Sequence, residues 1–156
     1  MTKKQIQSAK HFRSAASEAF IPTMRELARA YQAFADYSAK HIRELDLTPS
    51  QFDVIATLGN TDGMNMTDLA EKTLVTKGTL TGIIDRLEKK GIVTRIVPRE
   101  NRRSFTIVLT PEGEKAFNTV FPVHIAYLKE RFDRLSPQEL EHTRQTLETL
   151  RKIFYQ

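Results

Sequence analysis

The sequence predicts a mainly α-helical fold that contains one small β-hairpin. Apolar side chains recur with a period near 3.6 over residues 21–45 and again after residue 110, as in long amphipathic helices. Between these regions, two short helical segments are followed by alternating apolar and polar residues, the pattern of a strand. This order predicts a winged helix-turn-helix core at residues 47–110, flanked by helical regions at 1–46 and 111–156.

Capping signals place the helices of the core. Thr48, followed by proline and with Gln51 at the capping-box spacing, predicts the start of the first core helix. Thr67 is expected to cap the short helix that follows it, and Thr76 the next one. Gly91 is expected to end that third helix at its C′ position.

A polar hairpin is predicted after this helix. Its strands are expected at residues 92–97 and 104–109, and residues 98–103 form the loop between them. An arginine-rich loop suits insertion into a narrow, electronegative minor groove, and the alternative is a solvated loop. The arginines of the loop are Arg99, Arg102 and Arg103.

Two further helices are expected after the hairpin. Thr110, followed by proline, begins the first, and Ser136 opens the second with a capping box. Pro122 is expected to bend or interrupt the first of them. Both terminal helical regions are apolar on one face, and one small winged core cannot cover that surface. The sequence therefore predicts a homodimer in which a second copy of the chain covers these faces.

The positive charge of the chain is concentrated in one segment. The 156 residues carry a net charge of +5, and residues 76–103 contain eight basic and three acidic residues. The remaining residues are balanced, so the whole excess lies in this segment. It indicates a local anion-binding surface, or alternatively a solvated charged face.

The helix after Thr76 has the composition of a recognition helix. In a helix-turn-helix, the second helix enters the major groove and its N-terminal residues meet base edges. Threonine side chains suit base or phosphate contacts, and glycine allows close approach, although a well-capped helix explains the same residues. Arg86, Lys89 and Lys90, further along the helix, are expected to meet phosphates, and for the two lysines the alternative is that they complement the helix dipole. The candidate DNA contacts outside the hairpin loop are Thr67, Thr76, Lys77, Gly78, Thr79, Thr81 and Arg86.

Several function classes find no support in the sequence. The absence of cysteine excludes disulfides, thiolate metal sites and thiol-based redox sensing. The four histidines are scattered without ligand spacing, so no metal site or cofactor is expected. No phosphate loop, nucleophile elbow or long apolar run is found, so neither an enzyme nor a membrane protein is expected, and the cytoplasm is the expected compartment. A protein-docking winged helix is the remaining alternative, and the arginine-rich loop argues against it.

The order and the amino-acid sequences of these segments resemble those of the MarR family of bacterial transcriptional regulators. The resemblance is carried by LTPSQF at 47–52, MTDLA at 66–70, TLTGIIDRLEKKGIVTR at 79–95, NRRS at 101–104 and IVLTPEG at 107–113. One departure is Asn101, where the family usually has an aspartate that pairs with the arginine at position 103. Asn101 retains hydrogen bonding and loses that ion pair, which puts the rigidity of the hairpin in doubt.

The resemblance implies a homodimer that binds a near-palindromic operator in double-stranded DNA. Its terminal helices would interlock, and repression is the commoner action in the family. Relatives often bind small anionic aromatic or lipophilic effectors between the dimerisation helices and the winged module. By position, Tyr31, Tyr37, His41 and Phe52 would line such a crevice, and the alternative is that these side chains are ordinary core packing.

Overall fold

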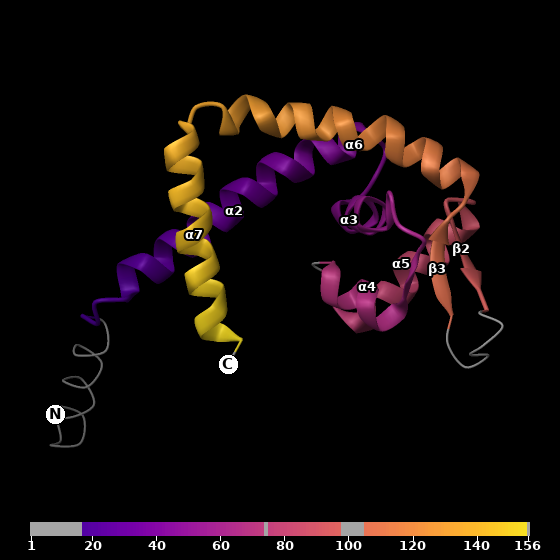
Figure 1. The fold of residues 1–156 in the computed structure, drawn as a ribbon, viewed down its shortest axis with the longest axis horizontal. Helices are drawn as coiled ribbons and strands as arrows, with labels where there is room; N and C mark the ends of the chain where they lie inside the picture. The colour runs from indigo at the N-terminus through magenta and orange to yellow at the C-terminus, as the bar shows by residue number, and fades with distance from the viewer. Residues whose placement is uncertain (1–16, 74, 98–104, 156) are drawn as a thin grey trace, which may run out of the picture. The chain divides into compact units, whose positions relative to one another are not determined.

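The computed structural model describes residues 17–73, 75–97 and 105–155 of the chain (Figure 1). Its elements are α2 (Ile21–Glu44), α3 (Pro49–Leu58), β1 (Met64–Asn65), α4 (Met66–Lys72), α5 (Lys77–Lys89), β2 (Val93–Ile96), β3 (Thr106–Leu109), α6 (Pro111–Phe132) and α7 (Pro137–Phe154). The chain divides into two compact units, Met1–Lys40 and His41–Gln156, and the division falls within α2. The predicted order of helices, hairpin and helices is confirmed.

Two predicted capping boxes begin α3 and α7. The Thr48 backbone N–H donates to Gln51 Oε1 at 3.0 Å, and the Gln51 N–H donates to Thr48 Oγ1 at 3.2 Å. Ser136 and Glu139 make the same reciprocal pair at 2.8 and 3.3 Å. Each box satisfies N–H groups that have no partner within the helix, so the local sequence sets where both helices begin.

The start of α4 differs from the prediction. The expected cap, Thr67, lies inside the helix, and the N-cap residue is Asn65. Asn65 Oδ1 accepts from the backbone N–H groups of Thr67 and Asp68, both at 2.9 Å, and its Nδ2 donates to Asp68 Oδ2. An asparagine side chain is as good a cap as a threonine, and this one reaches two N–H groups at once. The prediction that Thr67 caps the helix is therefore wrong, and its side chain is exposed.

A short strand that the sequence did not predict completes the sheet. β1 pairs antiparallel with β3, which also pairs antiparallel with β2, so the strand order is β1-β3-β2. The register places Met64 opposite Ile107, and Arg95 opposite the same residue on the other side. Gly91 ends the preceding helix with a φ of +71°, which confirms the predicted C′ glycine.

One apolar core joins these elements. Leu80, Ile84 and Leu87 on α5 are completely buried, as is Ile107 on β3. α3, α4 and α6 add further buried side chains to the same cluster, and the helices lie beside the hairpin strands in Figure 1. Burying α5 along one stripe leaves its opposite face to solvent, which fixes the surface that the helix presents.

Thr110 caps the start of α6, as predicted, and its Oγ1 accepts the backbone N–H of Gly113 at 3.0 Å. A Cβ atom on Gly113 would lie 2.0 Å from the carbonyl oxygen of Ile92, so only glycine permits this approach of helix and hairpin. α6 then runs as one helix to Phe132 with Pro122 inside it. Pro122 therefore does not interrupt the helix, in contrast to one of the two predicted outcomes. No helix in the described part of the chain is long and apolar enough to span a membrane.

Candidate nucleic-acid interface

The N-terminal turn of α5 is the centre of the candidate surface. Thr76 is the N-cap residue with extended backbone angles, as expected, but its side chain makes no capping hydrogen bond to a backbone N–H. Its Oγ1 atom instead lies 3.0 Å from Thr79 Oγ1. The hydroxyl pair leaves the first N–H groups of α5 without a side-chain cap from Thr76, and the end of a helix with such groups attracts anions.

The outward face of α5 is small and polar at this end. Lys77, Gly78, Thr79 and Thr81 are exposed, and a Cβ atom built on Gly78 would meet nothing within 4 Å. Gly82, one turn further along, is also exposed, and its nearest such neighbour is Arg86 Nη2 at 3.8 Å. Two glycines four residues apart lie on the same side of a helix, so the backbone is open to close approach there.

Basic side chains continue along α5 toward its C-terminal end. Arg86 and Lys89 lie in its last turn, and both are exposed together with Lys90. These residues follow the threonine turn on the same helix, which is anchored by its buried stripe. An extended anionic polymer that contacts the N-terminal turn would therefore also lie near these cations.

Arg95 on β2 does not belong to this cationic surface. Its guanidinium donates to Asp85 and to Glu88 on α5, and its backbone N–H donates to Glu88 Oε1 at 3.2 Å. The hydrogen bond to Asp85 is the main reason that the pKa of Arg95 is raised. The two acids thus neutralise Arg95 rather than the exposed basic residues, and the ion pairs tie the hairpin to α5.

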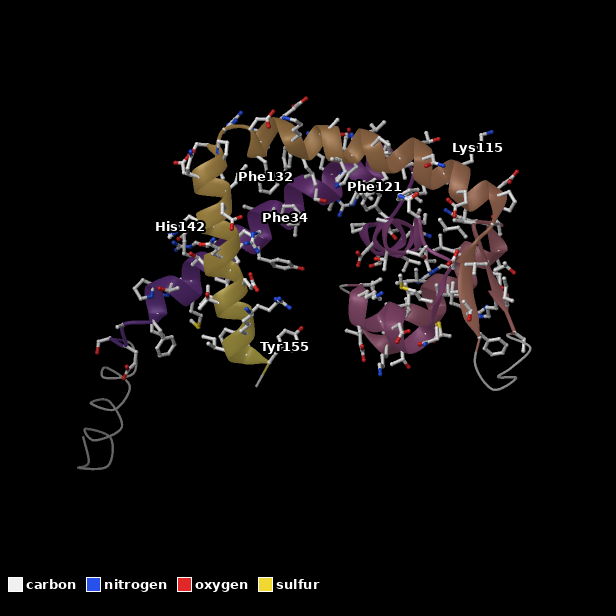
Figure 2. All side chains as sticks on the ribbon, viewed as in Figure 1. Phe34, Lys115, Phe121, Phe132, His142 and Tyr155 are labelled. Atoms are coloured by element: carbon white, nitrogen blue, oxygen red, sulfur yellow. The ribbon has the colours of Figure 1, made fainter. Side chains whose placement is uncertain are left out.

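A second group of side chains gathers where α6 passes α3. His124 is almost completely buried, and its Nδ1 atom lies 3.0 Å from Nδ1 of His41. The Phe52 ring meets His124 edge-on with centroids 4.7 Å apart, and Tyr127 stacks on His41 at 4.1 Å. Figure 2 shows Phe121 on the side of α6 that faces α3, and Lys115 on the opposite side. Of the predicted crevice residues, His41 and Phe52 thus both contact His124, which was not among the predicted site residues.

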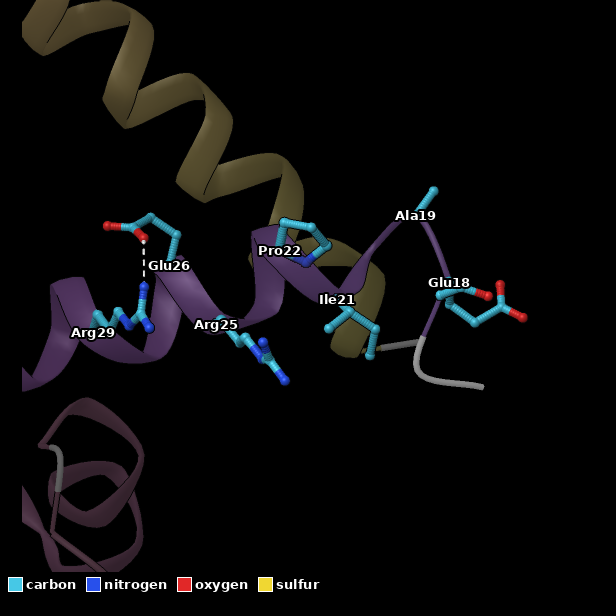
Figure 3. A pocket seen from close by; sticks show the side chains of 8 residues that line it. Glu18, Ala19, Ile21, Pro22, Arg25, Glu26 and Arg29 are labelled. Carbon is cyan, nitrogen blue, oxygen red and sulfur yellow. Dashed lines mark ion pairs between the residues drawn. The ribbon is translucent and has the colours of Figure 1, made fainter. Parts of the chain in front are cut away.

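The unit Met1–Lys40 contains a surface cavity of about 450 Å³ at the start of α2 (Figure 3). Arg29 and Glu26 on its wall form an ion pair at 3.7 Å, with both side chains about three-quarters exposed. An ion pair that is this exposed contributes little to stability. No predicted site residue in the described part of the chain lines this cavity; its lining residues are Ser17, Glu18, Ala19, Ile21, Pro22, Arg25, Glu26 and Arg29.

Comparison with known proteins identifies the family. The MarR family model matches residues 47–105, which hold α3, α4, α5 and β2. The regulator MhqR of Bacillus subtilis, an HTH-type transcriptional regulator, is 31% identical over 115 residues, which are 74% of this chain and 79% of MhqR. The chain belongs to the MarR family. This is a family of DNA-binding transcriptional regulators, and the predicted resemblance is confirmed.

Two solved structures have the same fold, and the first is of a MarR-family regulator. Sco3205 of Streptomyces coelicolor, in complex with DNA, has a TM-score of 0.76 and 22% identity, covering 83% of this chain and 84% of Sco3205. NadR, in complex with 4-hydroxyphenylacetate, has a TM-score of 0.66 and 28% identity, covering 82% of this chain and 91% of NadR. The predicted fold class, a winged helix core flanked by helices, is therefore confirmed.

The predicted site residues fall into three sets. The predicted DNA contacts on α4, on α5 and at the α5 N-cap are all exposed: Thr67, Thr76, Lys77, Gly78, Thr79, Thr81 and Arg86. The hairpin arginines Arg99, Arg102 and Arg103 lie outside the described residues, as does Asn101. Tyr31 and Tyr37 belong to the unit Met1–Lys40, whereas His41 and Phe52 belong to the other, so a crevice lined by all four stays a prediction.

Proposed function

We propose that this MarR-family protein is a sequence-specific, double-stranded DNA-binding transcriptional regulator, a repressor that a small-molecule ligand releases. The observation that carries the proposal is the exposed threonine and glycine turn of α5, with cations further along the same helix. Such a regulator would act in the cytoplasm of a bacterium, where the DNA lies.

The α5 turn would lie in the major groove. Thr76, Thr79 and Thr81 would meet base edges or phosphates, and Gly78 would let the helix backbone approach the duplex. Lys77 and Arg86 would contact phosphates, which position the protein on the DNA without reading its sequence. Thr67, exposed in the first turn of α4, would add a further phosphate contact.

The hairpin arginines would extend the contact into the adjacent minor groove. Arg99, Arg102 and Arg103 follow β2, which the ion pairs of Arg95 hold against α5. A narrow minor groove concentrates negative potential and attracts arginine side chains. The hairpin and the α5 turn would then hold neighbouring grooves of one duplex.

A homodimer would present two such surfaces to a near-palindromic operator. α7 buries none of its residues in the single chain, and its apolar side chains Leu147, Ile153 and Phe154 are about half exposed or more. Within Met1–Lys40, Met24, Tyr31 and Phe34 of α2 are likewise exposed. Apolar faces of this kind on two long helices are best covered by a second copy of the chain. Two-fold symmetry would then set half-sites about one helical turn, roughly 10 base pairs, apart.

The releasing ligand would be a small anionic aromatic or lipophilic compound. NadR, a structural neighbour, holds 4-hydroxyphenylacetate, which combines an aromatic ring with a carboxylate. In this chain Tyr31, Tyr37, His41 and Phe52 would supply aromatic surface and a basic ring nitrogen for such a compound. Binding that favours a form unable to hold the operator would release the DNA.

The experiment is selection of bound duplexes from a random pool with the full chain, followed by anisotropy titration of the selected duplex. Two matched variants each remove one positive charge, so they distinguish a contact at the α5 surface from an effect of net charge. Lys77→Gln removes the charge on α5, and Lys115→Gln removes one on the side of α6 that faces away from α3. Lys77→Gln should weaken binding roughly five- to 150-fold, because it removes a contact worth about 1–3 kcal/mol. Lys115→Gln should bind as the wild type does. Failure to enrich any duplex, or equal losses in both variants, contradicts the proposal.

The same duplex tests release. Adding 4-hydroxyphenylacetate or a related phenolic acid to the preformed complex should lower the anisotropy in a saturable way. An anionic compound without a ring, such as acetate at the same concentration, is the control. Equal release by both compounds indicates an ionic-strength effect and contradicts a ligand site.

A further inference from the structure

Two acidic side chains interrupt the cationic surface of α5. The helix carries three basic residues, Lys77, Arg86 and Lys89, and two acidic residues, Asp85 and Glu88, so its own net charge is only +1. An anionic polymer that lies along this helix therefore meets carboxylates as well as cations. A carboxylate that lies close to a phosphate repels it, and the repulsion opposes binding unless another charge compensates it.

Asp85 lies on the outward face of α5. It is three residues after Gly82 and four before Lys89, and residues at these spacings are neighbours on one face of a helix. Gly78, four residues before Gly82, begins the same row, whereas Leu80 and the other buried side chains lie on the opposite side. The Asp85 side chain is 50% exposed. The row that the proposed function turns toward the duplex thus contains a carboxylate.

Arg95 of β2 pairs with both carboxylates of α5. Its Nη2 atom donates to Asp85 Oδ1 at 2.5 Å, and its Nη1 atom donates to Glu88 Oε2. Its backbone N–H donates to Glu88 Oε1 at 3.2 Å, which holds the Glu88 side chain against the strand. The Arg95 side chain is 24% exposed, the least of the three. Its charge is therefore directed at the two acids of α5 and not at solvent.

We propose that Arg95 is a charge-compensating residue, which supports DNA binding by keeping Asp85 and Glu88 from repelling the phosphate backbone. In this role Arg95 acts through the two acids and not through a phosphate contact of its own. Without it, α5 would present two carboxylates that no cation pairs, one of them in the outward row between Gly82 and Lys89. The inference rests on the proposed function, because only a duplex that lies along α5 meets these carboxylates.

Arg95→Gln should weaken DNA binding, and the loss should depend on salt. A unit charge about 4 Å from a phosphate in water changes an equilibrium constant roughly fivefold. The variant makes this surface more negative by one charge, so the Kd should rise about fivefold at about 50 mM salt. Added salt screens repulsion between exposed charges, so the loss should be smaller at about 300 mM salt.

Two further variants distinguish charge compensation from a purely structural role. The ion pairs also tie the hairpin to α5, so Arg95→Gln loses both the tie and the compensating charge. The triple variant Arg95→Gln, Asp85→Asn, Glu88→Gln has neither an ion pair nor an unpaired carboxylate at this point, and it should bind DNA at least as tightly as the wild type. The double variant Asp85→Asn, Glu88→Gln, which retains Arg95, should do the same. If the tie alone matters, both bind as weakly as Arg95→Gln, which overturns the proposal.

Anisotropy titration of the full chain with its selected duplex measures these Kd values at both salt concentrations. Arg144→Gln on α7 is the matched control, because Arg144 is likewise paired with two acids, Glu141 and Glu148, at 2.7 and 3.1 Å. It removes the same charge from a similarly paired arginine and should bind as the wild type does. Equal losses in Arg95→Gln and Arg144→Gln indicate an effect of net charge and overturn the proposal, as does a wild-type Kd for Arg95→Gln at low salt.

A second measurement does not need the operator. Heparin is a sulfated polysaccharide without bases, and the salt concentration that elutes the chain from a heparin column reports its attraction to a polyanion. Arg95→Gln should elute at lower salt than Arg144→Gln, and the triple variant should elute no earlier than the wild type. If this order is found but no duplex is enriched from the random pool, the proposed function fails and the compensation of the α5 acids stands. If duplexes are enriched but Arg95→Gln and Arg144→Gln elute together, the compensation alone is overturned.

Discussion

The replacement Gly78→Ala adds one methyl group, which should have opposite effects on the stability of the fold and on DNA binding. Gly78 lies in the first turn of α5, it is exposed, and a Cβ atom there meets nothing within 4 Å. The added methyl group therefore strains nothing in the folded chain. Glycine costs about 0.5–1 kcal/mol relative to alanine inside a helix, so the variant should be more stable by up to about that amount. For a chain of this length, the gain raises the Tm by up to about 2–4 °C.

DNA binding should change in the opposite direction. If the backbone at Gly78 approaches the duplex closely, the methyl group takes space that the DNA occupies. Excess volume in a packed interface costs about 1–3 kcal/mol, which raises the Kd roughly five- to 150-fold. Thermal unfolding and anisotropy titration on the same preparation measure both effects. A more stable protein with weaker DNA binding is a combination that general damage to the fold does not produce.

Asn118→Ala is the control for helix propensity. Asn118 is exposed inside α6, and alanine there should raise stability by about 0.7 kcal/mol or less without reaching the duplex. Its Kd should equal that of the wild type. If Gly78→Ala is stabilised and binds DNA as tightly as Asn118→Ala does, then the α5 turn does not approach the duplex, and the reasoning about this helix is refuted.

Four further predictions concern the hairpin and the charges. Gly113→Ala should destabilise the fold by about 1–3 kcal/mol in denaturant unfolding, because its Cβ would lie 2.0 Å from the Ile92 carbonyl oxygen; an unchanged midpoint contradicts this packing. Arg95→Gln should cost about 1 kcal/mol at low salt and less at high salt, since its ion pairs are partly exposed; equal losses at both salts would argue against them. Arg103→Ala should weaken operator binding roughly five- to 150-fold in a gel-shift titration while leaving the Tm unchanged, and unaltered affinity would remove the minor-groove contact. For the wild type, log K should fall linearly with log salt, because phosphate contacts release counterions, and a flat response is incompatible with a DNA-binding surface.

Local signals predicted most of the secondary structure. The caps at Thr48, Ser136 and Gly91 depend on residues within a few positions of each other, and all three are confirmed. β1 was missed because two residues show no periodicity, and only pairing with β3, far along the chain, makes them a strand. Thr67 was predicted as the cap, and Asn65 was not considered, because the sequence alone does not say which nearby polar side chain reaches the N–H groups.

The sequence predicted which residues belong to the candidate site, but not which side chains contact one another there. Counting charges in residues 76–103 treated Arg95 as part of the cationic surface, whereas its two acid partners on α5 neutralise it. A signal was present, since Asp85 and Glu88 lie three residues apart on one helix and precede a strand arginine. The contact of His41 with His124 joins residues 83 positions apart, and no local pattern indicates it.

Amide NMR of the full chain, as the selected duplex is added, tests most directly whether the α5 turn contacts DNA. The signals of residues 76–82 at the start of α5 should shift or broaden first, and those of Gln138 to Lys152 on α7 should remain where they are. Shifts confined to other elements, with the α5 turn unchanged at saturating DNA, would contradict the claim that this turn grips the duplex.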